Sequence, residues 1–296
     1  MRLLAALLLA PALAAAQSLE PRAYSNLPVG LNILLVGYAY SEGELAFDAT
    51  VPLDNGETHV HAVPIGYVRS LDVLGKAGSI GLVVPLVHLT ARATLDGVGE
   101  TQRKVSGLGD PTLRLAWNFY GAPALSAKEF ASYRQDLIVG TSLTITAPFG
   151  QYDSDRLVNI GTNRWSFKPE LGFSQAIGVW TVELAGGVTF FTRNDDFFHG
   201  NSRSQEPLYS TQLHVTRQLG GGVWAAASGT YYAGGRSSLN GVEKNDQISG
   251  SRVALTLSLP VDQQNSVKLA AIRGLYARTG ADYSSVGVIW QHLWGD

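Results

Sequence analysis

Two histidines, His59 and His61, are the first residues whose type and spacing could support chemistry. On a β-strand, residues two positions apart share a face, so both imidazoles could bind one metal ion. No carboxylate occupies a convincing third ligand position, and both histidines lie near an expected outer loop. A solvated pair explains them better than a metal site, and we predict neither a metal nor a cofactor.

The remaining motifs do not support nucleophilic catalysis. His88, His214 and His292 are isolated, and their spacing from serines and acidic residues does not identify a triad. The Gly-x-Ser-x-Gly motif is absent. The glycines at 220–222 precede an expected strand rather than a helix, so they do not resemble a phosphate-binding loop. The segment 152–155 offers oxygens suited to calcium but lacks the rest of a binding signature. We predict that the protein is not an enzyme.

Four charged residues within expected strands are the better candidates for function: Arg114, Lys168, Glu170 and Glu183. They occupy the polar phase of their strands. In a membrane barrel this phase faces the lumen, because a lipid-facing Arg or Lys at mid-depth costs about 2–4 kcal/mol. Two interpretations stay open. These side chains either line a substrate path or form an ion-pair network that fills a narrow interior.

The elements that would position these charges are strands with one apolar and one small or polar face. Residues 253–259 and 137–145 show the pattern best, with aliphatic side chains at every second position. About twelve segments have the length and alternation of a barrel strand. These segments are 31–41, 58–70, 78–95, 108–120, 136–147, 165–177, 180–193, 206–218, 223–233, 249–260, 266–278 and 282–294.

The two faces make a soluble sandwich and a membrane barrel distinguishable. A sandwich buries its apolar face, whereas a barrel turns that face toward lipid. For the barrel we expect accessible apolar side chains at Leu137, Val139, Leu143, Ile145, Val253, Leu255, Leu257 and Leu259. The expected lumen phase consists of the small residues Gly140, Ser142, Thr144, Ala254, Thr256 and Ser258.

The connections between the expected strands favour a closed outer-membrane barrel with both termini in the periplasm. Long polar connections, expected outside the cell, follow the odd strands, and short periplasmic turns follow the even strands, which is the asymmetry of these barrels. Two connections break the rule: 121–135 is long for a periplasmic turn, and the loop between the last two strands is very short. The long connections are 42–57, 96–106, 148–164, 194–205 and 234–248. Five of the six tryptophans fall at the periplasmic strand ends, where an aromatic girdle is expected: Trp117, Trp180, Trp224, Trp290 and Trp294.

The N-terminus indicates export. Arg2 precedes an apolar run at 3–9 and a small-residue stretch at 14–16, which is typical of a signal peptide cleaved near Ala16. We therefore expect a signal peptide at 1–16 and a single domain at 17–296. The chain has no cysteine, which excludes disulfides and thiolate metal sites, and its net charge of -2 gives no sign of a nucleic-acid partner.

Three sequence blocks resemble a known family. The segment 20–32, the Gly-Leu-Gly-Asp-Pro run at 107–111 and the segment 148–169 are similar to blocks of the family named for a putative MetA pathway of phenol degradation. The positions that carry the resemblance are Pro28, Gly30, Asn32, Gly107, Gly109, Asp110, Pro111, Asn159, Gly161, Asn163, Trp165 and Pro169. From the residues alone, the Asp110-Pro111 pair is better explained as a strand-entry or bulge device than as a ligand contact.

The resemblance implies an outer-membrane transporter of Gram-negative bacteria that takes up small aromatic or hydrophobic molecules by passive passage. The alternative is a non-transporting structural or adhesive barrel, or less commonly a membrane-embedded hydrolase. The expected partners are outer-membrane lipid, a small apolar or aromatic solute and, during insertion, the barrel-assembly machinery. The C-terminus resembles the assembly signal at Ser285, Gly287 and Trp290, but His292 stands at a usual aromatic position.

Overall fold

A computed structural model describes residues 19–44, 53–95, 99–279 and 282–295. The expected signal peptide lies outside these residues. The single helix that they contain is α1 (Ala127–Phe130). None of the described helices has the length and apolar character needed to cross a membrane. The barrel strands are β1 (Asn32–Glu44), β2 (Leu53–Val73), β3 (Lys76–Leu95), β5 (Thr112–Tyr120), β6 (Leu137–Thr146), β7 (Ser166–Ile177), β8 (Trp180–Phe191), β11 (Leu208–Gly220), β12 (Val223–Gly234), β15 (Ile248–Pro260), β16 (Asn265–Thr279) and β17 (Asp282–Trp294).

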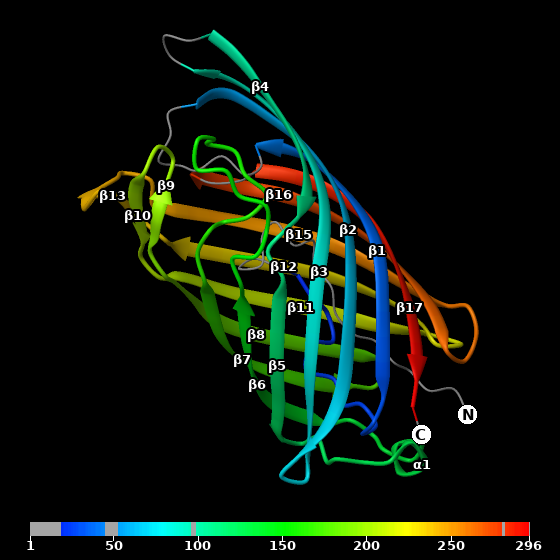
Figure 1. The fold of residues 1–296 in the computed structure, drawn as a ribbon. Coiled ribbons are helices and arrows are strands. Elements are labelled where there is room, and N and C mark those ends of the chain that lie inside the picture. The colour runs from blue at the N-terminus through cyan, green and yellow to red at the C-terminus, as the bar shows by residue number, and fades with distance from the viewer. Residues whose placement is uncertain (1–18, 45–52, 96–98, 280–281, 296) are drawn as a thin grey trace.

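These twelve strands form a closed antiparallel barrel, which confirms the predicted fold. The ring closes because β1 pairs with β2 on one side and with the last strand, β17, on the other. The register places Asn32 opposite Trp294, so the two ends of the barrel domain meet at one rim. α1 lies at that rim in Figure 1.

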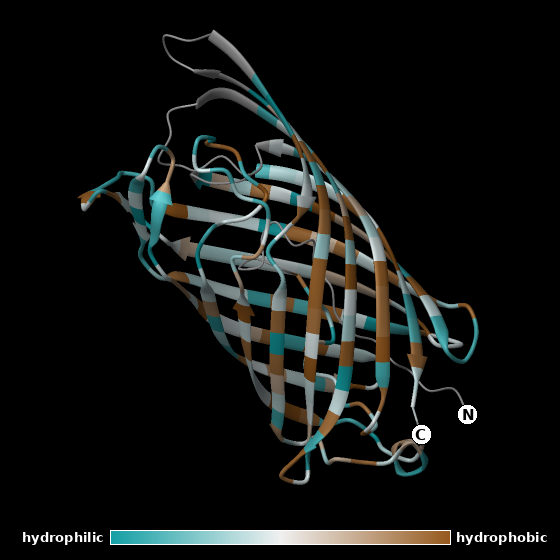
Figure 2. Cartoon of the chain, viewed as in Figure 1, coloured by the Kyte–Doolittle hydropathy of each residue, from teal (hydrophilic) through white to brown (hydrophobic). Residues whose placement is uncertain are grey.

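The two faces of the strands point as the alternation predicts. Val253, Leu255 and Leu259 are exposed on the outside, and the other five predicted lipid-facing side chains are half-buried rather than buried. On the inner face Gly140, Ser142, Ala254 and Ser258 are buried. Figure 2 shows hydrophobic residues alternating with more polar ones along the strands. No second layer covers the apolar outer face of the described barrel, as expected for a wall in contact with lipid.

The two rims of the barrel differ in the length of their connections, with mostly short turns at one rim and long connections at the other. The β2–β3 turn consists of Leu74 and Gly75, both with positive φ, which is the geometry that matches the twist of a two-residue hairpin. At the opposite rim the connections contain a separate four-stranded sheet that the sequence did not predict. Its strands are β9 (Asn194–Phe197), β10 (Asn201–Gln205), β13 (Ser237–Leu239) and β14 (Val242–Glu243).

One predicted loop is wrong. Residues 96–106 largely belong to β4 (Gly99–Leu108), which pairs with the outer half of β3. The part of β3 nearer the periplasm, residues 78–83, pairs with β5. β4 and β5 therefore occupy one strand position, which is interrupted at Gly109, Asp110 and Pro111. Proline lacks an N–H for the ladder, and this interruption is the bulge-like device expected for the Asp110-Pro111 pair.

One girdle assignment is also wrong. Trp224 lies at the expected depth, but its side chain is buried inside the barrel. It lies two and four positions before Ala226 and Ser228, which also point inward. The alternation along β12, and not the depth in the membrane, therefore decides that its side chain faces the lumen. Trp290 and Trp294 remain exposed on the outside and sandwich the His292 ring, with centroid distances of 5.8 and 5.6 Å.

Candidate functional site

The N-terminal segment Leu19–Leu31 runs inside the barrel, where it appears in blue behind the front strands of Figure 1. Its prolines interrupt any regular hydrogen-bonding pattern, so it forms no strand. Near the periplasmic rim the Asn26 side-chain amide donates to the Pro123 carbonyl, at 3.1 Å. Leu27 packs in a buried cluster with Ile33, Leu35, Val68 and Leu293. The segment is therefore fixed both to the connection after β5 and to the wall formed by β1, β2 and β17.

Tyr24 is the main contact between this segment and the wall. Its side chain is buried, and its hydroxyl donates to Glu170 Oε1 at 2.8 Å. The Asn118 side-chain amide donates to the Tyr24 carbonyl at 3.2 Å. Two glycines of the wall make room for the ring, because a Cβ at Gly140 would lie 2.7 Å from the ring and one at Gly172 would overlap it. Tyr24 thus fits a slot that the β6 and β7 glycines form.

The four charged residues predicted from the sequence all point into the lumen around this segment. Glu170 forms an ion pair with Lys168, at 2.8 Å, beside the Tyr24 hydroxyl. The Arg114 guanidinium lies over the Tyr24 ring, 5.7 Å from its centroid. Glu183 is buried and accepts a hydrogen bond from the backbone N–H of Arg22. The structure therefore brings all four together around the N-terminal segment.

Sequence reasoning missed the partners that the N-terminal segment and β16 supply. Glu20, Arg22 and Tyr24 lie in a segment without periodicity, so nothing in the sequence placed them in the lumen. Lys268 is different, since it shares a strand phase with Ser266 and Ala270 and could have been assigned to the inner face. The Lys268 ammonium and the Arg22 guanidinium each lie 5.6 Å from the Trp224 ring centroid, within the range of a cation–π contact.

A cavity lies between the N-terminal segment and the wall made by β1, β2 and β15–β17. Its volume is about 720 Å³, counting the part that is open to solvent. Most of the lining side chains are small or aliphatic, and its charged lining residues are Glu20 and Lys268. The apolar lining consists mainly of Leu19, Pro21, Ala39, Pro64, Ala254, Ala270, Ile272 and Ile289. An apolar solute would replace water in this space at little polar cost.

The first family block anchors the N-terminal segment. The Ser70 hydroxyl donates to the Pro28 carbonyl at 2.5 Å. Gly30 has a φ of 82°, a left-handed conformation that favours glycine. The Asn32 amide nitrogen donates to the Gly30 and Trp294 carbonyls, each at 3.2 Å. These contacts join the lumen segment to the first and last strands, so Pro28, Gly30 and Asn32 have a structural role.

The second and third blocks meet at Asp110. Its buried carboxylate accepts hydrogen bonds from the Gly150 N–H at 2.9 Å and from the Thr162 N–H and hydroxyl at 2.8 and 2.7 Å. Close backbone approach explains the glycines here. A Cβ at Gly109 would lie 2.8 Å from Pro85, one at Gly161 would lie 2.8 Å from the Gly150 backbone, and one at Gly107 would overlap the Gln151 side chain. Segment 147–165 thereby covers the interrupted wall beside Pro111.

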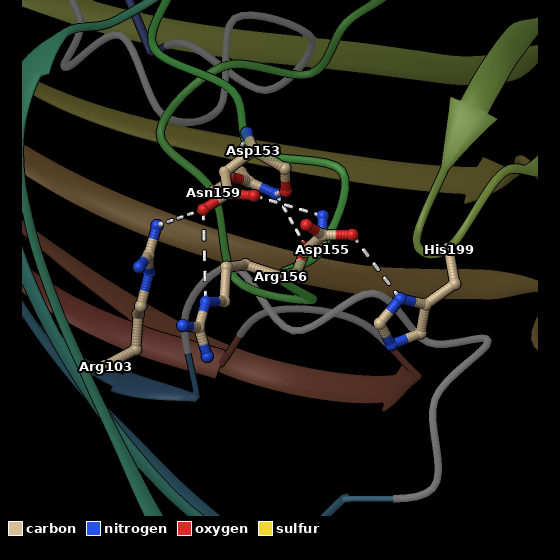
Figure 3. A network of polar contacts seen from close by, with 6 residues as sticks. All are labelled: Arg103, Asp153, Asp155, Arg156, Asn159 and His199. Carbon is tan, nitrogen blue, oxygen red and sulfur yellow. Dashed lines mark hydrogen bonds and ion pairs between the residues drawn. The ribbon is translucent and has the colours of Figure 1, made fainter.

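The rest of the third block orders the outer loops. Asn159 bridges the loop by accepting from the Asp153 N–H and donating to the Asp153 carbonyl, at 2.9 and 3.0 Å. Figure 3 shows the Asp153 carboxylate facing Arg103 of β4 and Arg156, at 3.7 and 3.9 Å. The predicted solvated loop at 152–155 therefore carries a polar network. Among the described residues no group of three His, Cys, Asp or Glu side chains could hold a metal ion.

The last three positions that carry the family resemblance are Asn163, Trp165 and Pro169. The Asn163 side-chain amide donates to Asn194 at 2.9 Å. Trp165 stacks on Phe167, with centroids 6.3 Å apart, and Pro169 lies opposite Leu143 of β6. None of these three residues lines the cavity described above.

The histidine pair lies on the outer face of the barrel. The Tyr40 hydroxyl and His59 Nδ1 are 2.9 Å apart, and the Tyr38 hydroxyl and His61 Nδ1 are 2.7 Å apart. The His61 ring also lies 6.2 Å from that of His88. This Tyr-His cluster lies on the outside of the wall rather than in the lumen, and aromatic rings in that place are typical of a membrane–water interface.

Comparison with known proteins agrees with this architecture. The model of the family described as "Putative MetA-pathway of phenol degradation" matches residues 49–286. The COG4313 outer membrane channel from Pseudomonas putida F1 is 21% identical, with a TM-score of 0.78 over 93% of this chain and 99% of that chain. The β domain of the Bordetella autotransporter BrkA is 13% identical, with a TM-score of 0.53 over 90% of this chain and 100% of that one. No curated protein matches the chain at a significant level.

Proposed function

Since this chain belongs to the Putative MetA-pathway of phenol degradation family, we propose that it is an outer-membrane channel for passive uptake of small aromatic or similarly apolar molecules. The protein would reside in the Gram-negative outer membrane, after cleavage of a signal peptide near Ala16 and insertion by the barrel-assembly machinery. It would act without a cofactor and without catalysing a reaction.

The cavity beside the N-terminal segment is the observation that carries this proposal. Its lining is largely apolar, with a few polar and charged groups, as is usual for small-molecule sites. It lies inside a closed barrel whose outer surface suits lipid. The family's link to phenol degradation supplies the aromatic part of the substrate class. The lumen charges Arg114, Lys168, Glu170 and Glu183 would orient a polar group of the solute.

A non-transporting barrel is the second candidate, and the N-terminal segment favours it. Leu19–Leu31 occupies part of the lumen and is held by Tyr24, Leu27 and Asn32. In that case the lumen charges would serve only to pack this segment against the wall. The two functions differ in whether the cavity belongs to a solute path.

The decisive experiment fills the cavity without disturbing the wall. Ala270 lines the cavity, whereas Ala271, the next residue on β16, is exposed on the opposite face. A deletion strain would express the wild type, Ala270→Trp or Ala271→Trp, and uptake of labelled phenol and benzoate would be measured at low external concentration. We expect Ala270→Trp to reduce uptake to the level of the deletion strain.

The Ala271→Trp variant is the matched control, because its ring would face lipid. It should support uptake at the wild-type rate. Equal uptake by the deletion strain and the wild type, together with no solute flux through purified protein in planar bilayers, would contradict the channel and favour the structural barrel.

A further inference from the structure

Lys268 is a buried cation that faces the cavity and has no ion-pair partner among the described residues. Its side chain is 6% exposed, and it lines the cavity together with aliphatic residues of β15–β17. The face of Trp224 lies 5.6 Å away, and Glu20, in the same cavity, is the carboxylate whose charge acts on it without a direct ion pair. Burying an ammonium group is costly unless a partner compensates for the lost water. The cavity is the place from which such a partner can approach.

The other lumen cations lie outside the lining of this cavity, and all except Arg114, whose Nη1 and Nη2 are buried without a hydrogen-bond partner, contact polar or charged groups of the protein. Lys168 is paired with Glu170 at 2.8 Å, and Arg252 donates to the Tyr283 hydroxyl at 3.1 Å. Arg22 lies beside Glu183 and over Trp224, and Arg114 lies over Tyr24. Lys268 differs from these in combining burial with direct access to an apolar cavity.

Charge also favours an anion over a cation at this depth. Around the N-terminal segment, four cationic side chains face three carboxylates within the described part of the lumen. The cations are Arg22, Arg114, Lys168 and Lys268, and the carboxylates are Glu20, Glu170 and Glu183. Glu170 is paired with Lys168, and the charge of Glu183 interacts with that of Arg22, so Arg114 and Lys268 face one remaining carboxylate, Glu20.

We propose that this cavity is a binding site for small apolar acids, in which Lys268 binds the carboxylate and the aliphatic wall contacts the apolar body. The site rests on the proposed function, because it lies in the solute path of that channel. The ammonium donates to the carboxylate, while Ala270, Ile272 and Ile289 pack against a ring or short chain. A neutral molecule of the same shape keeps the apolar contacts and lacks the charge-assisted hydrogen bond. The site therefore prefers the acid anion.

Glu20 sets a limit on this preference. Its carboxylate lines the same cavity and would repel a bound anion. Removing the charge of Lys268 and removing that of Glu20 should thus change anion affinity in opposite directions. If either residue only stabilised the fold, there would be no reason for the two substitutions to change anion affinity in opposite directions.

The test measures binding of benzoate and its neutral isostere benzamide to the purified full-length barrel by calorimetry. In Lys268→Met, the dissociation constant for benzoate should rise about tenfold or more, as for loss of a hydrogen bond to a charged group, while that for benzamide stays unchanged. In Glu20→Gln, benzoate should bind more tightly and benzamide should again be unaffected. Lys104→Met is the matched control, because Lys104 is exposed on β4 outside the cavity, and it should bind both compounds like the wild type.

The outcomes separate this site from the channel itself. Unchanged benzoate binding in Lys268→Met, or equal loss of affinity for benzoate and benzamide, would overturn the acid site. The channel would still stand in that case if the wild type takes up phenol. If the wild type neither binds benzoate nor supports uptake, both proposals fail. If Lys268→Met does not fold, as judged by loss of the compact band in unheated gels, Glu20→Gln decides, and unaltered benzoate affinity in that variant would overturn the site.

Discussion

The ring of Tyr24 lies directly against the Cα of Gly172, and a Cβ at that position would overlap the ring. The contact joins a residue of the N-terminal segment to one in the middle of β7. Glycine normally weakens a strand, so its presence here has a packing reason. The inner face of the wall is shaped to hold one aromatic side chain of the segment inside the barrel.

Gly172→Ala should therefore loosen the N-terminal segment. The added methyl forces the Tyr24 ring out of its slot, and overpacking of this kind costs about 1–3 kcal/mol. The urea midpoint of unfolding should fall, and ionic conductance in planar bilayers should rise as the segment moves. Gly186→Ala is the matched control on the neighbouring strand, because its Cβ would meet nothing within 4 Å. An equal effect of both substitutions would show that strand propensity, and not the Tyr24 contact, is responsible.

Tyr24 and Glu170 should be energetically coupled through their hydrogen bond. Tyr24→Phe removes the donor and leaves the ring, while Glu170→Gln removes the charge and leaves the shape. A double-mutant cycle on the free energy of unfolding should give a coupling of about 1–3 kcal/mol, because the bond is buried and involves an ionised acceptor. Additive single effects would show that the lumen charges and the segment stabilise the barrel independently.

Most of the barrel could be predicted because its wall follows one local rule. Residues 253–259, for example, alternate strictly, since one side faces lipid and the other faces a lumen of small side chains. β4 was missed because residues 99–108 lie toward the outer loops, where the outer face meets water and needs no aliphatic side chains. The alternation that identifies a strand disappears where the membrane ends.

The site was predictable only in part, for a physical reason. Arg114, Lys168, Glu170 and Glu183 lie on strands, so their phase gave their direction. Arg22 and Tyr24 lie in a segment that has no period and is ordered only by tertiary contacts, such as that of Tyr24 with Gly172. Trp224 shows the opposite error, because depth alone suggested a girdle while its strand phase places it in the lumen.

The β15–β16 turn should make barrel stability depend on acidic pH. The Asp262 carboxylate accepts from the N–H groups of Gln264 and Asn265, each at 2.8 Å, and from the Asn265 side chain. These hydrogen bonds, the Gln264 N–H first, lower the pKa of Asp262 below its usual value. Stability from this group is thus fully present above the ordinary carboxyl pKa and is lost as the pH falls through the lowered value.

Asp262→Asn is the corresponding test. Unfolding midpoints in urea should be compared between pH 7 and pH 3 for the variant and the wild type. The wild type should lose more stability toward low pH than the variant, because only the wild type has a carboxylate to protonate at this turn. Parallel pH profiles would mean that Asp262 is not a source of the acid dependence.

Asp110 should determine whether segment 147–165 stays closed over the interrupted wall. Asp110→Ala leaves the Gly150 and Thr162 N–H groups and the Thr162 hydroxyl without their acceptor, which should cost about 1–3 kcal/mol. The cost falls mainly on local opening, since the segment forms no strand and few backbone hydrogen bonds join it to the wall. A loss of about 1.4 kcal/mol multiplies the open population about tenfold. Trypsin should then cleave at Arg156 and Arg164 of the folded variant about tenfold faster than in the wild type.

Asp155→Ala is the control, because that side chain lies in the same segment and is 80% exposed. Equal cleavage of the two variants would assign the closure of the segment to contacts other than the Asp110 carboxylate.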